Sequence, residues 1–374
     1  MKIELENISV SFGKKQLFNS INLTLPTGKF IVILGPSGSG KTTLLRVLAG
    51  LQEPITGQIR FDEQDVTRLP ANKRNVALVF QNYPLFPHMT IEENLRFPLE
   101  SRKKGNVFKR PSYSKEEMEA KILSMLNLLH MEEHRHKYPH QLSGGEKQRI
   151  AIGREIIREP TFYLYDEPLS NIDMRLRFEM RTWIRKLHQI LGKTTVYVTH
   201  DQNEAMALGE QIILMNEGEI VQIGTPEELY YHPQTKFVAT FIGNYPMNFL
   251  AFRKEERAFY LETEEKELEL SEKLQNIVKE NDLKRGELGF RAESIKEYDK
   301  SKPISKTQIP LIAEIKDTEQ ILDKQIISLE YNGKMLYYST RTKKIFQVGE
   351  TLTILLNLDE CYIFDQEEKN REQA

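Results

Sequence analysis

The sequence predicts an α/β domain with a parallel sheet, followed by a smaller all-β domain. Up to about residue 240, short continuous apolar runs alternate with helix-like segments, which is typical of strands buried on both faces. After about Asn248 this alternation stops, and Lys/Glu-rich segments separate short runs of β-forming residues. A length of 374 residues suits two domains better than one. We place the domain limits at 1–240 and 245–366, with a polar tail at 367–374.

The first domain has clear strand and helix boundaries. Its strands are expected at 3–10, 21–25, 30–34, 162–165 and 195–199 and, around a hairpin turn at 216–219, at 212–215 and 220–223. A turn at 13–15 joins the first two strands. The run at 30–34 precedes a helix over 41–49, which Gly50 ends in the usual glycine position.

The second domain shows weaker but repeated strand signals. Strands are expected at 258–261, 287–290, 326–331, 335–338 and 352–356. Between two of them lies Asn332-Gly333, a strong signal for a tight hairpin turn. These features predict an all-β domain.

A basic stretch at 101–115 interrupts the first domain. Its lysines and arginines favour a solvated surface loop, and a contact with phosphate or lipid is the alternative. Ser114 is placed to cap a helix that begins at Lys115.

Composition and charge exclude several classes of protein. Hydrophobic residues make up 39% of the chain and charged residues 28%, which predicts a folded globular protein. The formal net charge of −2 argues against nucleic acid as the main partner. With Cys361 as the single cysteine, no disulfide can form within the chain, and a reducing cytoplasm fits best. We find neither a secretory signal nor an apolar run long enough to span a bilayer, so work at a membrane requires a membrane partner.

Residues 35–42 form a glycine-rich phosphate-binding loop. They fit the P-loop pattern G-x-x-x-x-G-K-[ST] between a buried strand and a helix. Glycines let backbone N–H groups approach phosphate oxygens, and the helix N-terminus adds partial positive charge. Lys41 is expected to reach the β- and γ-phosphates, and the Thr42 hydroxyl to bind Mg²⁺. The candidate nucleotide-binding residues here are Gly35, Ser37, Gly38, Gly40, Lys41, Thr42 and Thr43. Alone, the motif predicts only nucleotide binding, which kinases, GTPases and many motors share.

Two acidic residues follow the predicted strand at 162–165. At this position, near a phosphate-binding loop, Asp166 is expected to hold Mg²⁺ and Glu167 to act as general base toward the attacking water. The alternative is an exposed acidic turn that Pro168 ends.

A second anion-seeking loop lies at 142–149. Ser143, Gly144 and Gly145 stand where a helix begins, and a hydroxyl at a helix N-terminus is suited to a phosphate. Two such loops in one nucleotide-binding fold are redundant unless loops from two subunits clasp each ATP. The sequence therefore predicts a dimer.

Residues 35–42, 142–149 and 166–168 together resemble the signature set of ABC ATPases, over residues 1 to about 240. The resemblance implies that Ser143 and Gly145 contact the γ-phosphate held by the opposite subunit. It also implies roles for four further residues. These are Gln81, which senses Mg²⁺ and the attacking water; His200, the switch histidine that holds the γ-phosphate; Asp173, in the loop that links the two active sites; and Phe12, which stacks on adenine.

Other segments resemble the importer branch of this family. Residues 81–90 are similar to the segment that receives a short helix of a membrane subunit, and residues 223–249 to the junction into the regulatory domain of sugar-importer ATPases. The resemblance implies a small OB-type barrel as that C-terminal domain. Residues 289–293 are similar to one of its motifs, with Ala292 where proline is usual, and residues 361–365 to its closing strand.

The resemblance implies an ATP-hydrolysing import motor that uses ATP and Mg²⁺. Its partners would be a second copy or a paired ABC subunit, two integral membrane permease subunits and, indirectly, an extracellular solute-binding protein. Nucleic acid is not expected, and the chain would lie peripherally at the cytoplasmic face of the cell membrane. Carbohydrate is the favoured cargo, with polyamine or glycerol phosphate as the alternative. A soluble ABC ATPase acting on nucleic acid or the ribosome is a more distant alternative.

Overall fold

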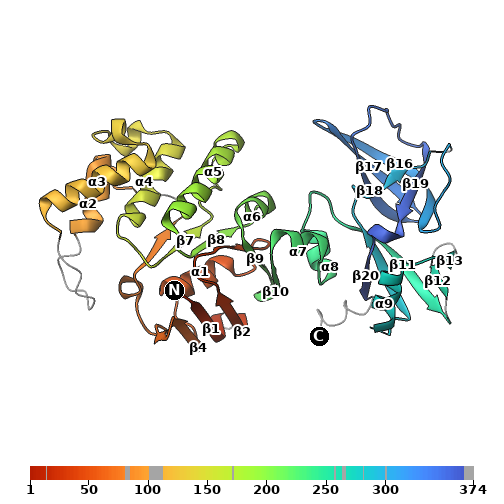
Figure 1. The fold of residues 1–374 in the computed structure, drawn as a ribbon, viewed down its shortest axis with the longest axis horizontal. Helices are drawn as coiled ribbons and strands as arrows, with labels where there is room; N and C mark the ends of the chain where they lie inside the picture. The colour runs from red at the N-terminus through yellow and green to blue at the C-terminus, as the bar shows by residue number, and fades with distance from the viewer. Residues whose placement is uncertain are drawn as a thin grey trace. The chain divides into compact units, whose positions relative to one another are not determined.

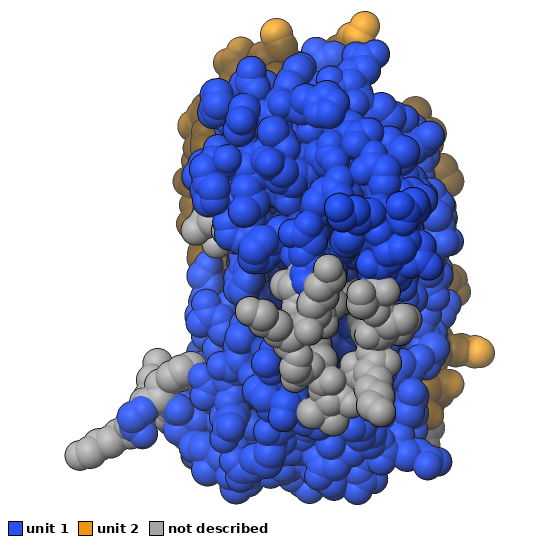
Figure 2. Space-filling model, turned by 90° about the vertical axis from the view of Figure 1, so that its left-hand side faces the viewer, with its two compact units in different colours: residues 1–228 blue, residues 229–374 orange. Residues whose placement is uncertain are grey.

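The computed structural model describes residues 1–13, 15–80, 85–100, 113–170, 172–256, 258–262, 267–280, 282–299 and 301–365. The chain divides into two compact units, Met1–Glu228 and Leu229–Ala374 (Figure 1, Figure 2). This division falls inside helix α7 (Pro226–Tyr231), before the expected limit at residue 240. The domain limits 1–240 and 245–366 and the tail at 367–374 stay predictions.

The first unit alternates strands and helices. In chain order these are β1 (Ile3–Phe12), β2 (Lys15–Leu25), β3 (Phe30–Leu34), α1 (Lys41–Ala49), β4 (Thr56–Phe61), β5 (Gln64–Asp65), β6 (Val76–Val79), α2 (Ile91–Glu100), α3 (Lys115–Leu129), α4 (Gly144–Ile156), β7 (Phe162–Asp166), α5 (Met174–Leu191), β8 (Thr195–Thr199), α6 (Gln202–Leu208), β9 (Gln211–Asn216) and β10 (Glu219–Gly224). The predicted second strand began at residue 21, whereas β2 begins six residues earlier.

A six-stranded sheet in the order β10-β9-β3-β8-β7-β6 forms the centre of this unit. The pairs from β9 through β6 are parallel, and β10 returns antiparallel to β9. All five residues of β3 and of β8 are buried, as expected for strands covered on both faces. The β9–β10 turn consists of Glu217 and Gly218, both with positive φ, as a tight hairpin requires. The predicted parallel sheet and hairpin are confirmed.

Helix α1 packs in a core that the central sheet shares with a second, antiparallel sheet of order β2-β1-β4-β5. Leu44, Leu45 and Leu48 of α1 belong to a core cluster with buried residues of both sheets. The helix ends at Gly50, as predicted, with φ of 74°. The buried guanidinium of Arg74 donates to the carbonyls of Val47 and Leu48, so it satisfies groups that a helix end leaves unpaired.

Helices α2, α3 and α4 form a separate helical group (Figure 1). Four charged side chains join α2 to α3 and to the loop after it. Glu92 pairs with Arg96 and with Arg135 Nε at 2.6 Å, and Glu119 pairs with Arg96 at 2.9 Å and with Arg135. The hydrogen bond from Arg135 lowers the pKa of Glu92 to about 2. Ser114 caps α3 with Glu117 in a capping box, so the predicted cap is confirmed.

The second unit contains mostly antiparallel strands. Its elements are the end of α7, α8 (Lys236–Phe241), β11 (Asn248–Glu255), β12 (Ala258–Leu261), β13 (Glu267–Leu268), α9 (Glu272–Glu280), β14 (Arg285–Phe290), β15 (Lys296–Glu297), β16 (Gln308–Ile321), β17 (Lys324–Tyr331), β18 (Lys334–Thr340), β19 (Thr351–Asn357) and β20 (Tyr362–Asp365). They form two five-stranded sheets, β13-β12-β11-β14-β20 and β15-β19-β16-β17-β18.

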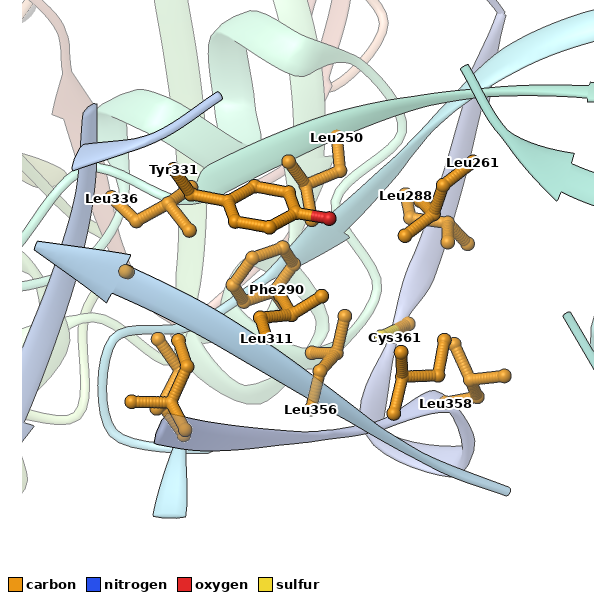
Figure 3. Packing of buried hydrophobic residues seen from close by; sticks show 14 of the residues in the cluster. Leu250, Leu261, Leu288, Phe290, Leu311, Tyr331, Leu336, Leu356, Leu358 and Cys361 are labelled. Atoms are coloured by element: carbon orange, nitrogen blue, oxygen red, sulfur yellow. The ribbon is translucent and has the colours of Figure 1, made fainter. Parts of the chain in front are cut away.

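One hydrophobic core joins these two sheets (Figure 3). Phe290, Leu311 and Leu356 come from three different strands and lie close together in it, all fully buried. The two antiparallel sheets agree with the predicted OB-type β domain, and helix α9 is an unpredicted addition. The predicted Asn332-Gly333 hairpin turn joins β17 to β18, with positive φ at both residues. Cys361 is buried in this core, and burial raises the pKa of its thiol.

Arg291 holds the segment with α7 and α8 against the β sheets that follow it. Its buried guanidinium donates to the carbonyls of Tyr230, Ala239 and Ile242. A side chain on Gly243 would approach this guanidinium to 3.0 Å, and the φ of Gly243 is 133°. The predicted motif at residues 289–293 therefore has a structural function, which is to fix α7 and α8 to β14.

Candidate functional site

The glycine-rich loop lies between β3 and α1, as its sequence predicts. Gly35, Gly38 and Gly40 have φ of 158°, 84° and 100°, in the range that favours glycine. A Cβ atom on Gly40 would lie 2.3 Å from Cε1 of Phe18, and one on Gly35 would lie 2.2 Å from the carbonyl oxygen of Met215. Backbone conformation and close packing both require glycine here.

Lys41 begins α1 and turns its ammonium group back over the loop. Nζ donates to the carbonyls of Gly35 and Pro36 at 2.9 and 2.8 Å. The residue is 5% exposed, and burial lowers the pKa of Lys41 in spite of the nearby Glu167 and Asp166 charges. A buried cation whose hydrogen bonds go to backbone carbonyls is suited to binding an anion.

Thr42 and Asp166 place two oxygen atoms side by side. The Thr42 hydroxyl donates to Oδ1 of Asp166 at 2.9 Å, which links α1 to the end of β7. Burial raises the pKa of Asp166, although Thr42 and nearby cations act in the opposite direction. Hard oxygen donors of this kind fit Mg²⁺, which usually keeps several waters and takes one or two protein ligands. Within the described part of the chain, no cluster of three or more His, Cys, Asp or Glu residues could hold a metal by itself.

Glu167 and His200 meet beside this pair because their strands are neighbours. β7 and β8 are parallel and in register, with Asp166 opposite Val198, so the residues that follow each strand share one sheet edge. His200 Nδ1 lies 3.1 Å from Oε2 of Glu167. Glu167 has φ of 46°, which is unusual for a non-glycine residue and common at functional sites. A strand-end carboxylate and a histidine in contact can orient and deprotonate a water molecule.

A cavity of about 420 Å³ lies beside the glycine-rich loop and Glu167. Its lining consists of Leu17, Ser37, Gly38, Gly40, Lys41, Thr42, Thr43 and Glu167. The cavity therefore combines a glycine-rich loop, a helix N-terminus, a cation and a carboxylate, a combination suited to a polyphosphate.

The second predicted loop lies at the start of α4 and does not contribute to this lining among the described residues. Ser143 caps α4 in a capping box with Glu146, and its hydroxyl lies 2.8 Å from Oε2 of Glu146. A Cβ on Gly144 would have nothing within 4 Å, whereas a Cβ on Gly145 would lie 2.9 Å from Leu176. Asp173 caps α5 by accepting a hydrogen bond from the N–H of Leu176. The structure thus brings Ser143, Gly144 and Gly145 to a helix N-terminus away from the cavity.

For two predicted site residues the structure describes no side chain. Gln81 is not among the described residues, and for Phe12 only the backbone, in β1, is described. Sequence reasoning in turn missed Gln148, which is fully buried and donates to the carbonyl of Pro168 at 2.9 Å. This bond ties α4 to the turn that carries Glu167. The sequence did contain a signal: Gln148 is a polar residue on the face of α4 where helical spacing otherwise places small and apolar residues.

Comparison with known proteins assigns the chain to a family. Residues 18–170 match the ABC transporter family. The sn-glycerol-3-phosphate import ATP-binding protein UgpC 1 of Rhizobium johnstonii is 36% identical over 362 residues, 97% of this chain and 94% of that protein. This chain belongs to the ABC transporter family. It is therefore an ATP-binding, ATP-hydrolysing protein, and the predicted fold class and enzyme class are confirmed.

Other ABC proteins match about two thirds of the chain. The sulfate/thiosulfate import ATP-binding protein CysA of Pectobacterium atrosepticum is 48% identical over 244 residues, 65% of this chain and 72% of CysA. The ATP-binding cassette MJ0796, solved as a dimer after hydrolysis with ADP and Pi, superposes with a TM-score of 0.51 at 31% identity, covering 60% of this chain and 98% of MJ0796. CbiO1 of Clostridium perfringens shares the fold, with a TM-score of 0.55 at 24% identity over 62% of this chain and 90% of CbiO1. Among the helices that the structure describes, none has the length and apolar character of a membrane span.

Proposed function

We propose that this ABC ATPase energises the import of a carbohydrate or a glycerol phosphate. The observation that carries the proposal is the alignment with a glycerol-3-phosphate import protein over 97% of the chain, β domain included. CysA, a sulfate/thiosulfate import protein, aligns over 65% of the chain, so similarity in the ATPase part is compatible with a different cargo. Because the match covers nearly the whole chain, it favours glycerol phosphate as cargo more strongly than the sequence motifs alone do. Carbohydrate stays a candidate because of the motifs at 223–249 and 289–293.

The cavity supports specific roles in hydrolysis. Lys41 and the N–H groups of the loop would hold the β- and γ-phosphates, with Gly35, Ser37, Gly38, Gly40 and Thr43 around them. Thr42 and Asp166, with Gln81 as a further candidate, would hold Mg²⁺, which neutralises phosphate charge. Water attacks the γ-phosphorus while the bond to the β-phosphate oxygen breaks, and Glu167 accepts the proton from the water. His200, in contact with Glu167, would orient this carboxylate and contact the γ-phosphate, and Phe12 would stack on the adenine.

Each complete site would need two copies of the chain. The loop at Ser143, Gly144 and Gly145 begins a helix and does not line its own chain's cavity among the described residues. A helix N-terminus is suited to binding an anion. Head-to-tail pairing would bring it to the γ-phosphate of the other copy, with Asp173 between the two sites. ATP would then favour the closed dimer over the open one, which is what allows its binding to drive movement.

The dimer would act on two membrane-spanning permease subunits at the cytoplasmic face of the membrane, with an extracellular solute-binding protein as an indirect partner. Affinity purification of the full chain from its native cell in mild detergent, followed by mass spectrometry, tests this. Co-purification of two multi-span membrane proteins is the expected result. Nucleic-acid-binding or ribosomal partners without any membrane protein would overturn the proposal.

The cargo is tested on the solute-binding protein that this purification identifies. We expect its melting temperature to rise with an oligosaccharide or with glycerol 3-phosphate. A rise with putrescine or sulfate alone would contradict the proposed cargo class and leave the ATPase role intact.

A further inference from the structure

Helix α5 carries three arginines, four residues apart, that reach toward α6 and the loop before it. Arg181 and Arg185 donate to the carbonyls of Asn203 and Ala207, each at 3.3 Å. Arg177 instead donates from Nη1 to the Asp201 carboxylate at 3.2 Å. A charge-assisted contact is stronger than one to a carbonyl, so Arg177 differs in kind from the other two.

The same guanidinium has a second contact on a different loop. Nη2 of Arg177 donates to the carbonyl of Ile172 at 3.1 Å. Ile172 precedes Asp173, and Asp201 follows His200. One planar group therefore joins the loop proposed to link two active sites to the loop that carries the proposed switch histidine.

The backbone on both sides of His200 is fixed around this contact. Thr199 Oγ1 accepts from the N–H of Asp201 at 3.0 Å and donates to Oε2 of Glu204 at 2.8 Å. Glu204 is 3% exposed and also accepts from the Tyr197 hydroxyl at 2.9 Å. Nε of Arg177 lies 3.9 Å from this buried carboxylate and offsets its charge. The other carboxylate oxygen of Asp201 caps α6.

We infer that Arg177 is a positioning residue for ATP hydrolysis, which sets the place of His200 relative to the linking loop by holding Asp201 and the Ile172 carbonyl together. The inference rests on the proposed role of His200. Arg177 contacts Asp201, the residue after His200, and is not among the residues that line the cavity, so we assign its effect to the placement of His200. The planar fork of arginine can hold two acceptors in fixed directions, which a lysine ammonium does less well.

Steady-state ATP hydrolysis by the full chain tests the inference. Because small displacements of a reacting group are costly, Arg177→Met should lower kcat about tenfold or more. KM for ATP should change less than about twofold, because ground-state binding is intact. Arg177→Lys should show a smaller loss. Arg181→Met, the matched control one turn along α5, should keep kcat within about twofold.

A second background separates positioning from general stability. The rate of single-turnover phosphate release should differ less than about twofold between His200→Ala and the double variant His200→Ala/Arg177→Met. The reason is that the side chain through which Arg177 acts is absent from both. The inference would be overturned if Arg177→Met lowered the rate of phosphate release equally in the parent and in His200→Ala. It would also be overturned if Arg177→Met kept the parental kcat. If Arg177→Met shows no cooperative unfolding transition, and so is not folded, Arg177→Lys takes its place. A parental kcat in Arg177→Lys would then overturn the inference. Parental activity of His200→Ala would instead refute the proposed role of His200 itself.

Discussion

The hydroxyl of Thr42 donates a 2.9 Å hydrogen bond to Oδ1 of Asp166, across 124 positions of sequence. The parallel sheet makes this contact possible, because β3 and β7 flank β8 and have their C-terminal ends at the same edge. Asp166 is the last residue of β7, and Thr42 lies in α1, which follows β3. Burial raises the pKa of Asp166, so a divalent cation at this point would stabilise the ionised carboxylate. The pair is therefore the proposed anchor for Mg²⁺.

Asp166→Asn should raise the Mg²⁺ concentration for half-maximal ATP hydrolysis at least about tenfold, since the amide keeps an acceptor for Thr42 but loses the charge. A magnesium titration of the ATPase rate measures this. Asp65→Asn is the control, because Asp65 forms a similar pair with Thr67 at 2.6 Å in the other sheet. An unchanged magnesium dependence in Asp166→Asn would contradict the assignment.

Gly40→Ala should destabilise the first unit more than Gly38→Ala. Both positions have positive φ, which disfavours alanine by about 1 kcal/mol. At Gly40 the new methyl would also lie 2.3 Å from Phe18, whereas nothing lies within 4 Å of one at Gly38. Overpacking adds about 1–3 kcal/mol to the loss in the free energy of unfolding. Urea denaturation checks the order, and equal losses at the two sites would show that Phe18 moves away at no cost.

Glu92→Gln should lower the free energy of unfolding by about 2 kcal/mol at pH 7, because it removes the charge that Arg135 and Arg96 share. The pKa of Glu92 falls from its ordinary 4.5 to about 2 on folding. Its stabilisation is therefore present above about 4.5 and is lost as pH falls toward about 2.

The difference between parent and Glu92→Gln in urea midpoint should accordingly be smaller at pH 3 than at pH 7. Glu63→Gln, at an exposed position, is the control and should show little difference at either pH. A constant difference across this range would mean that packing, and not charge, explains the effect of Glu92.

Local sequence predicted the elements whose signals are strong and short-range. The apolar run of β3, the glycine that ends α1 and the two-residue turns at Glu217-Gly218 and Asn332-Gly333 all lie where expected. The positions of two candidate site residues were also predictable, because parallel strands end at one edge of a sheet: Asp166 is the last residue of β7, and His200 follows β8.

Long-range contacts and mixed patterns were not predictable. β16 contains Pro310 and many exposed polar residues, and it pairs with β19 over its first half and with β17 over its second. Pro310 lies in the half that pairs with β19 alone, where a missing N–H is tolerated. The contacts of Arg74 with the end of α1 and of Arg177 with Asp201 join residues 24 or more positions apart. Nothing in the local pattern indicates such pairs.

The most direct test of the central claim is the mass of Glu167→Gln with and without MgATP, measured by sedimentation velocity. The variant lacks the proposed general base, so it should bind ATP without turnover and should sediment as a dimer only when ATP is present. Adding Ser143→Glu, which places a negative charge where the partner's γ-phosphate would lie, should abolish that dimer while ATP still binds. A Glu167→Gln protein that stays monomeric with bound ATP, or that hydrolyses ATP at the parental rate, would contradict the account.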